Sequence, residues 1–355
     1  MKQLMITRPG NLRDKNPETK GLMELMEVPE PQIKSPTDVK IRIAYCSICG
    51  SDPHVAENIF GRTPPYGMGH EVSGVIVELG SEVNTKGLKI GDKVAGSFLR
   101  ACGRCYHCQN GHPEFCRHAI DEGTAPGYAQ YVVWDESQVW KIPDEMPLRK
   151  ACFLEPTSIA VRVTDKANIK AGERCVVQGG GPIGLFCLQL LKMHGATSLT
   201  LIEPNPDRRD LGVKFGADHV IDPMTQDAVK ECERITNGLG FDVVVEASGV
   251  GSIAQIPLQI AADGGTIMYI AMYDSDFKMP VPMTDVFHNR NLTLTSTTVA
   301  PFCFPRSVQL LSRMDFDSFP VAVYDLEDAE EAFEMMFTNK YLKVVICCNR
   351  DLAER

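Results

Sequence analysis

The sequence lacks both a basic surface and a long apolar run, and these absences exclude two broad classes of function. Its 36 lysines and arginines are outnumbered by 46 aspartates and glutamates, which gives a formal net charge of −10 and a pI near 5.4. Nucleic acids and anionic membrane surfaces need a basic partner, and no stripe of lysine or arginine supplies one. No run approaches the ~18 apolar residues of a membrane span, and Pro9 ends the N-terminal run before a signal core could form. We therefore expect a cytoplasmic protein with no nucleic-acid or membrane partner.

Internal repeats and low-complexity tracts are also missing, so the 355 residues are expected to form ordinary globular domains. A single core stops growing near ~250–300 residues, which favours two domains. Up to about residue 139, glycines and prolines separate short β-like runs, at 39–44, 71–79, 93–96 and 129–134. From residue 170, strands expected at 174–178, 198–202, 242–246 and 265–270 alternate with helices expected at 182–194 and 206–215. This alternation predicts a parallel sheet with right-handed crossovers.

The segment after residue 294 breaks that alternation. We expect helices near 306–312 and 328–336 and a last strand at 343–347. Because this tail is too short to fold alone, we expect it to return to the first domain. The nucleotide domain would then be an insertion, with its cleft at the boundary.

Four of the thirteen cysteines form one cluster, C-G-R-C-Y-H-C-Q-N-G-H-P-E-F-C, at Cys102, Cys105, Cys108 and Cys116. In a chain of this length, cysteines indicate metal ligands and buried thiols rather than disulfides. Four close thiolates predict a tetrahedral zinc ion, which can brace a loop but has no open position for catalysis. An iron–sulfur cluster is the alternative, but a bacterial ferredoxin has a shorter last spacing and a proline where this chain has Arg117. The cysteines outside this cluster, apart from Cys49, are interpreted as inert buried thiols.

A glycine-rich turn follows the expected strand at 174–178 and opens the expected helix. It reads Gly179-Gly180-Gly181-Pro182-Ile183-Gly184, a G-x-G-x-x-G pattern in the context of dinucleotide binding. Its three pattern glycines would give a tight turn, close approach of the pyrophosphate, and helix-to-strand packing. The helix N-terminus would then face the pyrophosphate.

Glu203, which follows the next expected strand, predicts which dinucleotide is bound. Its carboxylate can accept hydrogen bonds from the adenosine ribose hydroxyls, whereas a 2′-phosphate would meet a like charge. NAD(H) is therefore favoured over NADP(H). Arg208 and Arg209 lie close enough in sequence to keep a phosphate partner open.

A second group of metal-binding residue types lies outside the cysteine cluster, at Cys49, His70, Glu71 and Glu155. One thiolate, one imidazole and one or two carboxylates form an incomplete protein shell that leaves room for water or substrate, as a catalytic zinc requires. Taken singly, each residue has an ordinary structural explanation. Cys49 is compatible with a buried thiol, His70 with a core histidine, and Glu71 and Glu155 with solvated acids.

Together these motifs resemble the zinc-containing medium-chain alcohol dehydrogenases, from about residue 25 to residue 348. They are most similar to the branch that holds polyol (sorbitol-type) and threonine dehydrogenases. The resemblance rests on Cys49-Gly50-Ser51-Asp52, Gly69-His70-Glu71, the four-cysteine loop, Leu154-Glu155-Pro156 and the glycine turn. It implies an α/β protein with a GroES-like catalytic domain, residues 1–157 and 295–355, and a Rossmann domain, residues 158–294. It also implies two zinc ions per chain and assembly into homodimers or homotetramers.

The resemblance also implies roles for single residues. Cys49, His70 and Glu155 fall on the catalytic-metal positions, and Glu71 falls where relatives have either a transient ligand or an acid beside the ligands. Which of the two glutamates binds zinc at rest stays open. Ser51 and His54 stand where related enzymes carry the alcohol proton to solvent. The expected reaction is reversible oxidation of a secondary alcohol to a ketone, with hydride transfer to NAD.

The chain departs from the polyol pattern in two places. Val55 replaces an aromatic residue, and residues 297–304 show no Arg–aromatic pair. Fewer donors for sugar hydroxyls favour a substrate bulkier or less polar than sorbitol, although Val299, Phe302 and Phe304 are equally compatible with a core. The alternatives are polyol, sugar or L-threonine 3-dehydrogenation and, in another class, a non-catalytic structural or cofactor-sequestering relative.

Overall fold

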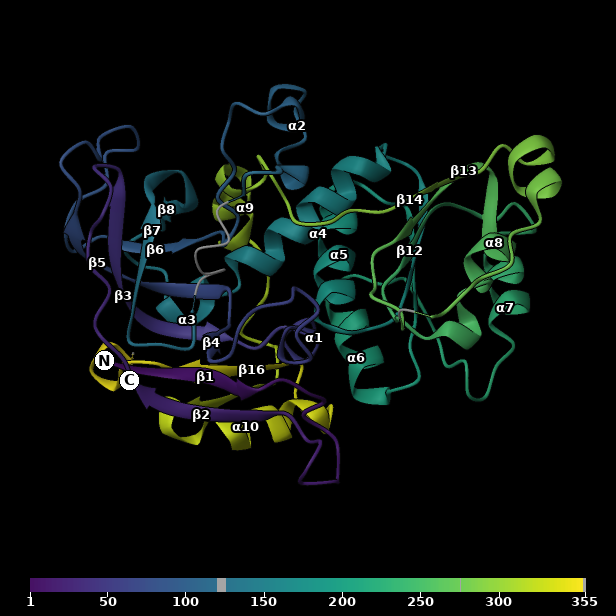
Figure 1. The fold of residues 1–355 in the computed structure, drawn as a ribbon. Helices are drawn as coiled ribbons and strands as arrows, with labels where there is room; N and C mark the ends of the chain where they lie inside the picture. Colours follow the sequence, from purple (N-terminus) through teal and green to yellow (C-terminus); the bar gives the residue numbers. More distant parts are fainter. Residues whose placement is uncertain (120–125, 275, 354–355) are drawn as a thin grey trace. The chain divides into compact units, whose positions relative to one another are not determined.

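The chain divides into two compact units. The computed structural model describes residues 1–119, 126–274 and 276–353. The first unit comprises Met1–Pro156 and Phe304–Arg355, and the second comprises Thr157–Cys303 (Figure 1). The sequence places the second boundary after residue 294, but β14 (Thr293–Thr295) still pairs with β13 of the second unit. The second unit therefore extends past residue 294.

The first unit is built on a seven-stranded sheet that joins both ends of the chain. Its order is β15-β16-β3-β5-β6-β8, and β7 also pairs with β3. β16 lies antiparallel to β3 with Ile346 opposite Cys46, and β5 lies antiparallel to β3 with Ser47 opposite Glu71. The strands are β3 (Asp38–Ser47), β5 (Glu71–Leu79), β6 (Lys93–Gly96), β7 (Tyr131–Asp135), β8 (Val139–Lys141), β15 (Val321–Asp325) and β16 (Lys343–Cys347).

A three-stranded sheet and several short helices complete this unit. The sheet has the order β2-β1-β4, with β1 (Lys2–Arg8), β2 (Leu22–Glu27) and β4 (Tyr66–Gly67). Its helices are α1 (Asp52–Ala56), α2 (Tyr106–Gln109), α3 (Leu148–Ala151), α9 (Phe304–Leu311) and α10 (Ala329–Phe337), and α4 (Leu154–Ala167) begins here and continues in the second unit. Alternate residues of β3, Val39, Ile41 and Ile43, are fully buried and pack in one core with Phe333 of α10. Burial of this alternating set fixes the register of the central strand.

The second unit is the parallel sheet that the alternating pattern predicts. Its order is β11-β10-β9-β12-β13-β14 and all its pairs are parallel. Counted from β9, this is the 3-2-1-4-5-6 order of a doubly wound dinucleotide-binding sheet. The remaining elements are β9 (Arg174–Gln178), β10 (Ser198–Ile202), β11 (His219–Ile221), β12 (Phe241–Glu246), β13 (Ala261–Tyr269), α5 (Pro182–Met193), α6 (Pro206–Lys214), α7 (Ala228–Ile235) and α8 (Ile256–Ile260).

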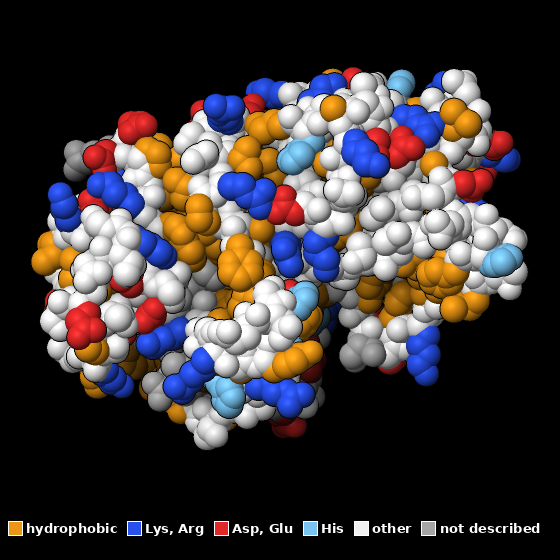
Figure 2. Space-filling model, turned by 90° about the horizontal axis from the view of Figure 1, so that it is seen from above, with side chains coloured by type: hydrophobic (Ala, Val, Ile, Leu, Met, Phe, Trp, Pro, Cys, Tyr) orange, Lys and Arg blue, Asp and Glu red, His pale blue; other side chains and the backbone are white. Residues whose placement is uncertain are grey.

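The surface carries charges of both signs. Figure 2 shows basic and acidic side chains interspersed with apolar ones on the face drawn. Across residues 1–119, 126–274 and 276–353, no helix is long and apolar enough to cross a membrane.

Candidate active site

Cys49, His70 and Glu71 meet where two neighbouring strands end and begin. Cys49 lies two residues after the end of β3, and His70 immediately precedes β5. Because Ser47 pairs with Glu71 across these antiparallel strands, the segments that carry the thiol and the imidazole lie side by side. One potential ligand atom of each of the three residues lies within 4.8 Å of the others. The sheet register therefore brings together residues that are about twenty positions apart.

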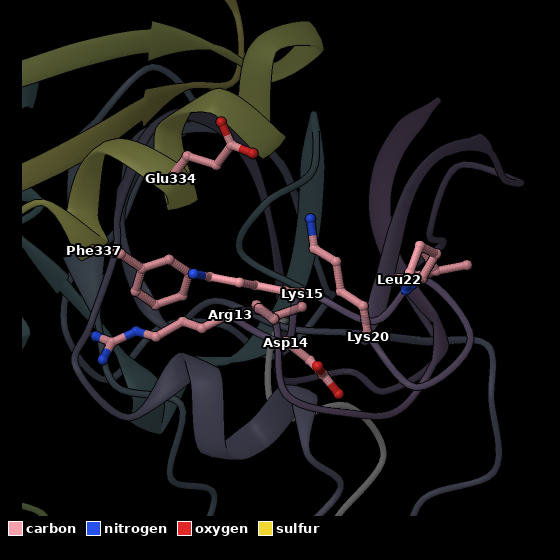
Figure 3. Close-up of a pocket in the computed structure, with 9 residues that line it drawn as sticks. Arg13, Asp14, Lys15, Lys20, Leu22, Glu334 and Phe337 are labelled. Atoms are coloured by element: carbon pink, nitrogen blue, oxygen red, sulfur yellow. The ribbon is translucent and has the colours of Figure 1, made fainter.

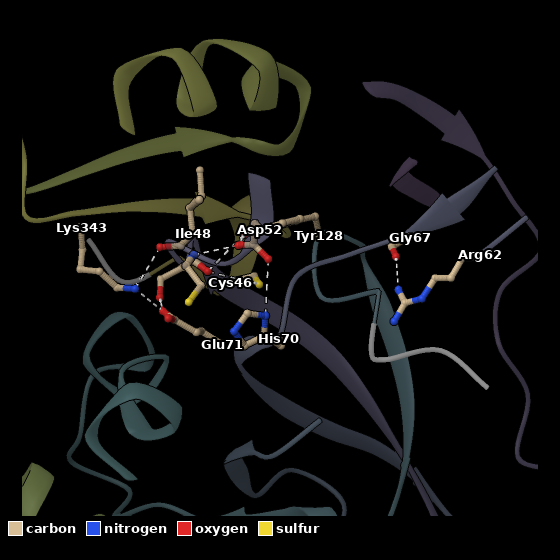
Figure 4. A network of polar contacts seen from close by, with 11 residues as sticks. Cys46, Ile48, Asp52, Arg62, Gly67, His70, Glu71, Tyr128 and Lys343 are labelled. Atoms are coloured by element: carbon tan, nitrogen blue, oxygen red, sulfur yellow. Dashed lines mark hydrogen bonds and ion pairs between the residues drawn. The ribbon is translucent and has the colours of Figure 1, made fainter. Parts of the chain in front are cut away.

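Asp52 holds two members of this group (Figure 4). Its Oδ2 accepts a hydrogen bond from the backbone N–H of Cys49 at 2.8 Å, and its Oδ1 lies 3.5 Å from Nδ1 of His70. With Nδ1 facing Asp52, the Nε2 atom of His70 is the one left for a metal ion. Asp52 is fully buried, and its Oδ1 has no hydrogen-bond partner among the described residues.

The electrostatics of His70 fit a cation. Burial lowers the pKa of His70, but the Cys49 thiol and the Asp52 carboxylate outweigh it and raise the pKa well above its usual value. The surroundings therefore stabilise positive charge at this point. A thiolate, an imidazole and a carboxylate with an open position are also the donor set of a catalytic zinc.

Glu71 has a cationic partner inside the protein, which the sequence analysis missed. Its Oε2 accepts from the ammonium of Lys343 at 2.5 Å and from the hydroxyl of Ser47, and Lys343 also donates to the carbonyl of Ile48 at 3.0 Å (Figure 4). Glu71 and Lys343 are only 1% and 5% exposed. The available signal was a lysine at the start of the apolar run of β16, a strand too buried to hold an unpaired charge.

Glu155 lies near this group but is not part of it. It stands in the first turn of α4, is 6% exposed, and does not meet the 4.8 Å spacing that joins the other three residues. Burial raises the pKa of the Glu155 carboxyl to about 7, although His70 opposes the rise. Its role as a metal ligand remains a prediction.

Ser51 and His54, the predicted proton carriers, lie at the helix that follows Cys49. Ser51 immediately precedes α1 and is partly buried. His54 stands within α1, with a side chain 37% exposed and Nδ1 3.6 Å from a carboxylate oxygen of Glu57. The helix α1 thus begins next to the segment that carries Cys49 and bears a side chain, His54, that solvent reaches.

The four cluster cysteines converge as their spacing predicts. Their four Sγ atoms all lie within 4.8 Å of one another, and those of Cys105 and Cys108 are 3.5 Å apart. Cys105 and Cys108 lie at and in α2, Cys116 directly follows a 3-10 turn at Pro113–Phe115, and Cys102 lies in the loop before α2. Backbone N–H groups, that of Cys108 first, lower the pKa of the Cys105 thiol to about 6, whereas desolvation and the neighbouring thiols raise the pKa of Cys108. The thiolate that zinc requires is therefore favoured at Cys105. Apart from Cys49, the cysteines outside this cluster are all buried, as predicted.

The glycine turn has the shape of a pyrophosphate cradle. Gly179 has φ +104°, and a Cβ there would lie 2.8 Å from the backbone of Ser248. Gly181, by contrast, faces open space and precedes Pro182 and Ile183 at the N-terminus of α5. Gly184 packs against the carbonyl of Gly179, which leaves no room for a side chain.

Glu203 and the two arginines flank this turn. The carboxylate of Glu203 accepts from the backbone N–H groups of Gly180 at 2.6 Å and Asn205 at 2.9 Å. The guanidinium of Arg209 is 3.2 Å from the carboxylate of Asp222 and donates to the carbonyl of Glu203 at 2.8 Å. Arg208 lies in the first turn of α6, where its backbone N–H donates to Asn205 Oδ1 at 3.3 Å.

A separate cavity of about 710 Å³ lies at the surface of the first unit (Figure 3). The loop between β1 and β2 lines one side, and Glu334 and Phe337 of α10 line the other. None of the predicted site residues borders it, so we do not connect it with the candidate chemistry.

Comparison with known proteins groups these features in one family. The model "Alcohol dehydrogenase GroES-like domain" matches residues 35–144, and "Zinc-binding dehydrogenase" matches residues 182–314. D-arabinitol dehydrogenase 1 of Uromyces fabae is 32% identical over 316 residues, covering 87% of this chain and 89% of the relative. L-threonine 3-dehydrogenase of Pyrococcus furiosus is 34% identical over 334 residues, covering 91% and 94%.

A solved structure shows the same fold. That of a candidate zinc-binding dehydrogenase from Sinorhizobium meliloti, bound to NADP, has a TM-score of 0.83 and 28% identity, and covers 98% of this chain and 100% of the other. The class is thus a two-domain oxidoreductase that acts on small molecules with zinc and a nicotinamide cofactor. The chain belongs to the zinc-containing medium-chain alcohol dehydrogenases, in the branch of polyol and threonine dehydrogenases. The predicted family and fold class, GroES-like plus Rossmann, are confirmed.

Proposed function

We propose that this chain reversibly oxidises a secondary alcohol to a ketone with NAD as hydride acceptor and a zinc ion at Cys49 and His70. The observation that carries the proposal is the convergence of Cys49, His70 and Glu71 within 4.8 Å, an incomplete ligand set. Zinc in such a site makes a bound hydroxyl more acidic and stabilises negative charge on oxygen. A second zinc at the four cysteines would serve the fold alone.

The chain's own residues then manage the proton. A bound nicotinamide would accept the hydride of the carbinol C–H bond, and the O–H proton would then have to leave the site. Ser51 stands two residues after Cys49, directly before α1, and the partly exposed His54 lies about one helical turn further on. We assign these two residues to the relay to solvent.

The preference for NAD rests on Glu203. Its buried carboxylate contacts the glycine turn through Gly180, so a 2′-phosphate at the adenosine ribose would meet a negative charge. Arg209 does not offset this charge, because it is already paired with Asp222. The NADP in the Sinorhizobium meliloti relative belongs to that protein and makes the cofactor ratio the decisive measurement.

We expect kcat/KM with NAD to exceed that with NADP by about fivefold or more, since one close like-charge contact costs about 1 kcal/mol or more. Glu203→Ala should lower the ratio of kcat/KM with NAD to kcat/KM with NADP. Asp207→Ala, which removes an exposed acid from the first turn of the neighbouring α6, is the control and should not change it. Equal efficiency of the two cofactors in the unmodified enzyme would contradict the assignment.

For the substrate we propose a secondary alcohol bulkier or less polar than sorbitol. Val55 packs against the apolar core of the first unit, and its side chain offers no hydrogen bond to a substrate. Phe304 stacks on Trp140 at 4.3 Å and is buried, so it belongs to the core, whereas Phe302 is 69% exposed. The expected order of kcat/KM, followed by NADH absorbance, is cyclic and aromatic secondary alcohols above sorbitol.

A polyol or L-threonine substrate is the alternative, favoured by the activities named for the relatives. Sorbitol or L-threonine at the top of the same assay panel would replace the proposal with that alternative. We also propose a homodimer or homotetramer, which light scattering during gel filtration would test.

A further inference from the structure

Tyr128 is a buried residue near the candidate zinc group, and both its backbone and its ring are held by neighbouring residues. Its backbone carbonyl accepts from Leu4 at 2.9 Å, and its N–H donates to the carbonyl of Met68 at 3.2 Å. Its ring lies edge-on to Phe333 of α10, with centroids 5.7 Å apart. A Cβ on Gly69, the residue before His70, would lie 2.8 Å from this ring. The ring thus fills the space behind the segment that carries His70.

The hydroxyl of Tyr128 ends on Asp52. It donates to Oδ2 of Asp52 at 2.6 Å, the same oxygen that accepts from the Cys49 N–H (Figure 4). Two donors therefore hold one carboxylate oxygen, and the other oxygen is left facing Nδ1 of His70 at 3.5 Å. Hydrogen bonds to a carboxylate are stronger and shorter than those between neutral groups.

From this arrangement we infer that Tyr128 is a positioning residue of the catalytic zinc site. Its hydroxyl fixes the rotation of the Asp52 carboxylate, and Asp52 in turn orients the His70 ring and the Cys49 backbone. Without the hydroxyl, Oδ2 keeps one donor and the carboxylate is free to turn, so the imidazole loses its fixed partner. The inference rests on the proposed zinc at Cys49 and His70, because it concerns how firmly that ion is held.

Tyr128→Phe tests the inference, because it removes the hydroxyl and keeps the ring that fills the core. The measurement is stepwise zinc release by EDTA from the full-length protein, which should show two steps. The step that Cys49→Ser abolishes identifies the Cys49 site, and the other belongs to the four cysteines. Partners of metal ligands typically contribute 10–100-fold to metal affinity, so the Cys49 step should move to about tenfold lower EDTA, with the cysteine step unchanged.

Tyr66→Phe is the matched control. Tyr66 is buried in the same core, and its hydroxyl donates to the backbone carbonyl of Val55 at 2.9 Å rather than to a side chain of the site. It should leave both release steps in place. With cobalt in place of zinc, the thiolate-to-cobalt absorption band should change in Tyr128→Phe and not in Tyr66→Phe.

Three outcomes overturn the inference: unchanged zinc release, an equal shift of both steps, and loss of the fold in Tyr128→Phe. Equal shifts or unfolding would show that the hydroxyl serves the core and not the site. If the unmodified protein bound zinc at the four cysteines only, the proposed function itself would fail. Two steps in the unmodified protein with no effect of Tyr128→Phe would instead refute the inference alone.

A double-mutant cycle checks that Tyr128 acts through Asp52. In an Asp52→Ala background the hydroxyl has lost its carboxylate acceptor and keeps only the backbone carbonyl of Ser47, at 3.4 Å. Adding Tyr128→Phe should then produce almost no further shift in zinc release. A second, additive tenfold shift would contradict the route through Asp52.

Discussion

The two candidate metal groups are built in opposite ways. The four cysteines lie within residues 102–116, are partly exposed, and are brought together by short local turns. The Cys49 group forms only when β3 and β5 pair, and the side chains that hold it, among them Asp52 and Lys343, are buried. One group is a local feature of the chain, and the other is a product of the whole first unit.

This difference separates stability from chemistry. A closed set of four thiolates leaves no coordination position for substrate, so its loss should act on the loop it braces. A metal ion held by the Cys49 group would keep a position open, and one member of the group, Glu71, is paired with the buried ammonium of Lys343. Substitutions there should act on the reaction when they remove a ligand, and on the fold when they remove the counter-ion.

The largest effect is expected from Cys49→Ser, the substitution that removes a ligand. Turnover should fall about 1000-fold, because several kcal/mol of charge stabilisation is lost with the metal. NADH binding, followed by its fluorescence, should remain. Cys232→Ala, which changes a buried thiol of α7, is the control, and wild-type turnover in Cys49→Ser would contradict the catalytic zinc.

Lys343→Met should give the largest loss of stability in this comparison. It leaves the buried Glu71 carboxylate without its counter-ion, which costs about 3–5 kcal/mol of unfolding free energy. Urea unfolding can be followed by tryptophan fluorescence, because both tryptophans, Trp134 and Trp140, lie in the first unit. Adding Glu71→Gln should recover part of the lost unfolding free energy. The control Lys340→Met, at an exposed site, should lower the unfolding free energy very little. A loss no greater than that of Lys340→Met would show that the pair is unimportant.

The contrast between the groups also shows what the sequence could reveal. The four-cysteine spacing and the glycine turn lie within short windows, and the strands at 174–178 and 198–202 match β9 and β10. The contacts that hold Asp52 and Glu71 join residues 76 and 272 positions apart. No local pattern encodes such pairs, because they arise from strand pairing and burial. For the same reason, Phe304 could be assigned to the core only from its packing against Trp140.

Cys105→Ser should show the reverse of Cys49→Ser. Loss of the bracing zinc should lower the melting temperature by about 10 °C, since a few kcal/mol shifts a domain of this size by that amount. Activity per folded molecule at 25 °C should stay within about threefold of the unmodified enzyme. Unchanged melting with a selective loss of turnover would mean that the cysteine group takes part in catalysis.

The smallest expected effect is the difference in stability between losing a hydrogen bond to a carboxylate and losing one to a backbone carbonyl. Ser47 donates to the buried carboxylate of Glu71, and Ser73, equally buried in the next strand, donates to the carbonyl of Leu148 at 2.6 Å. Bonds to charged groups contribute about 1.5–3 kcal/mol, against about 1 kcal/mol for neutral ones. Ser47→Ala should therefore lower the unfolding free energy more than Ser73→Ala, measured by tryptophan fluorescence in urea. Equal losses would mean that Lys343 alone satisfies Glu71, and the network behind the Cys49 group would then reduce to one ion pair.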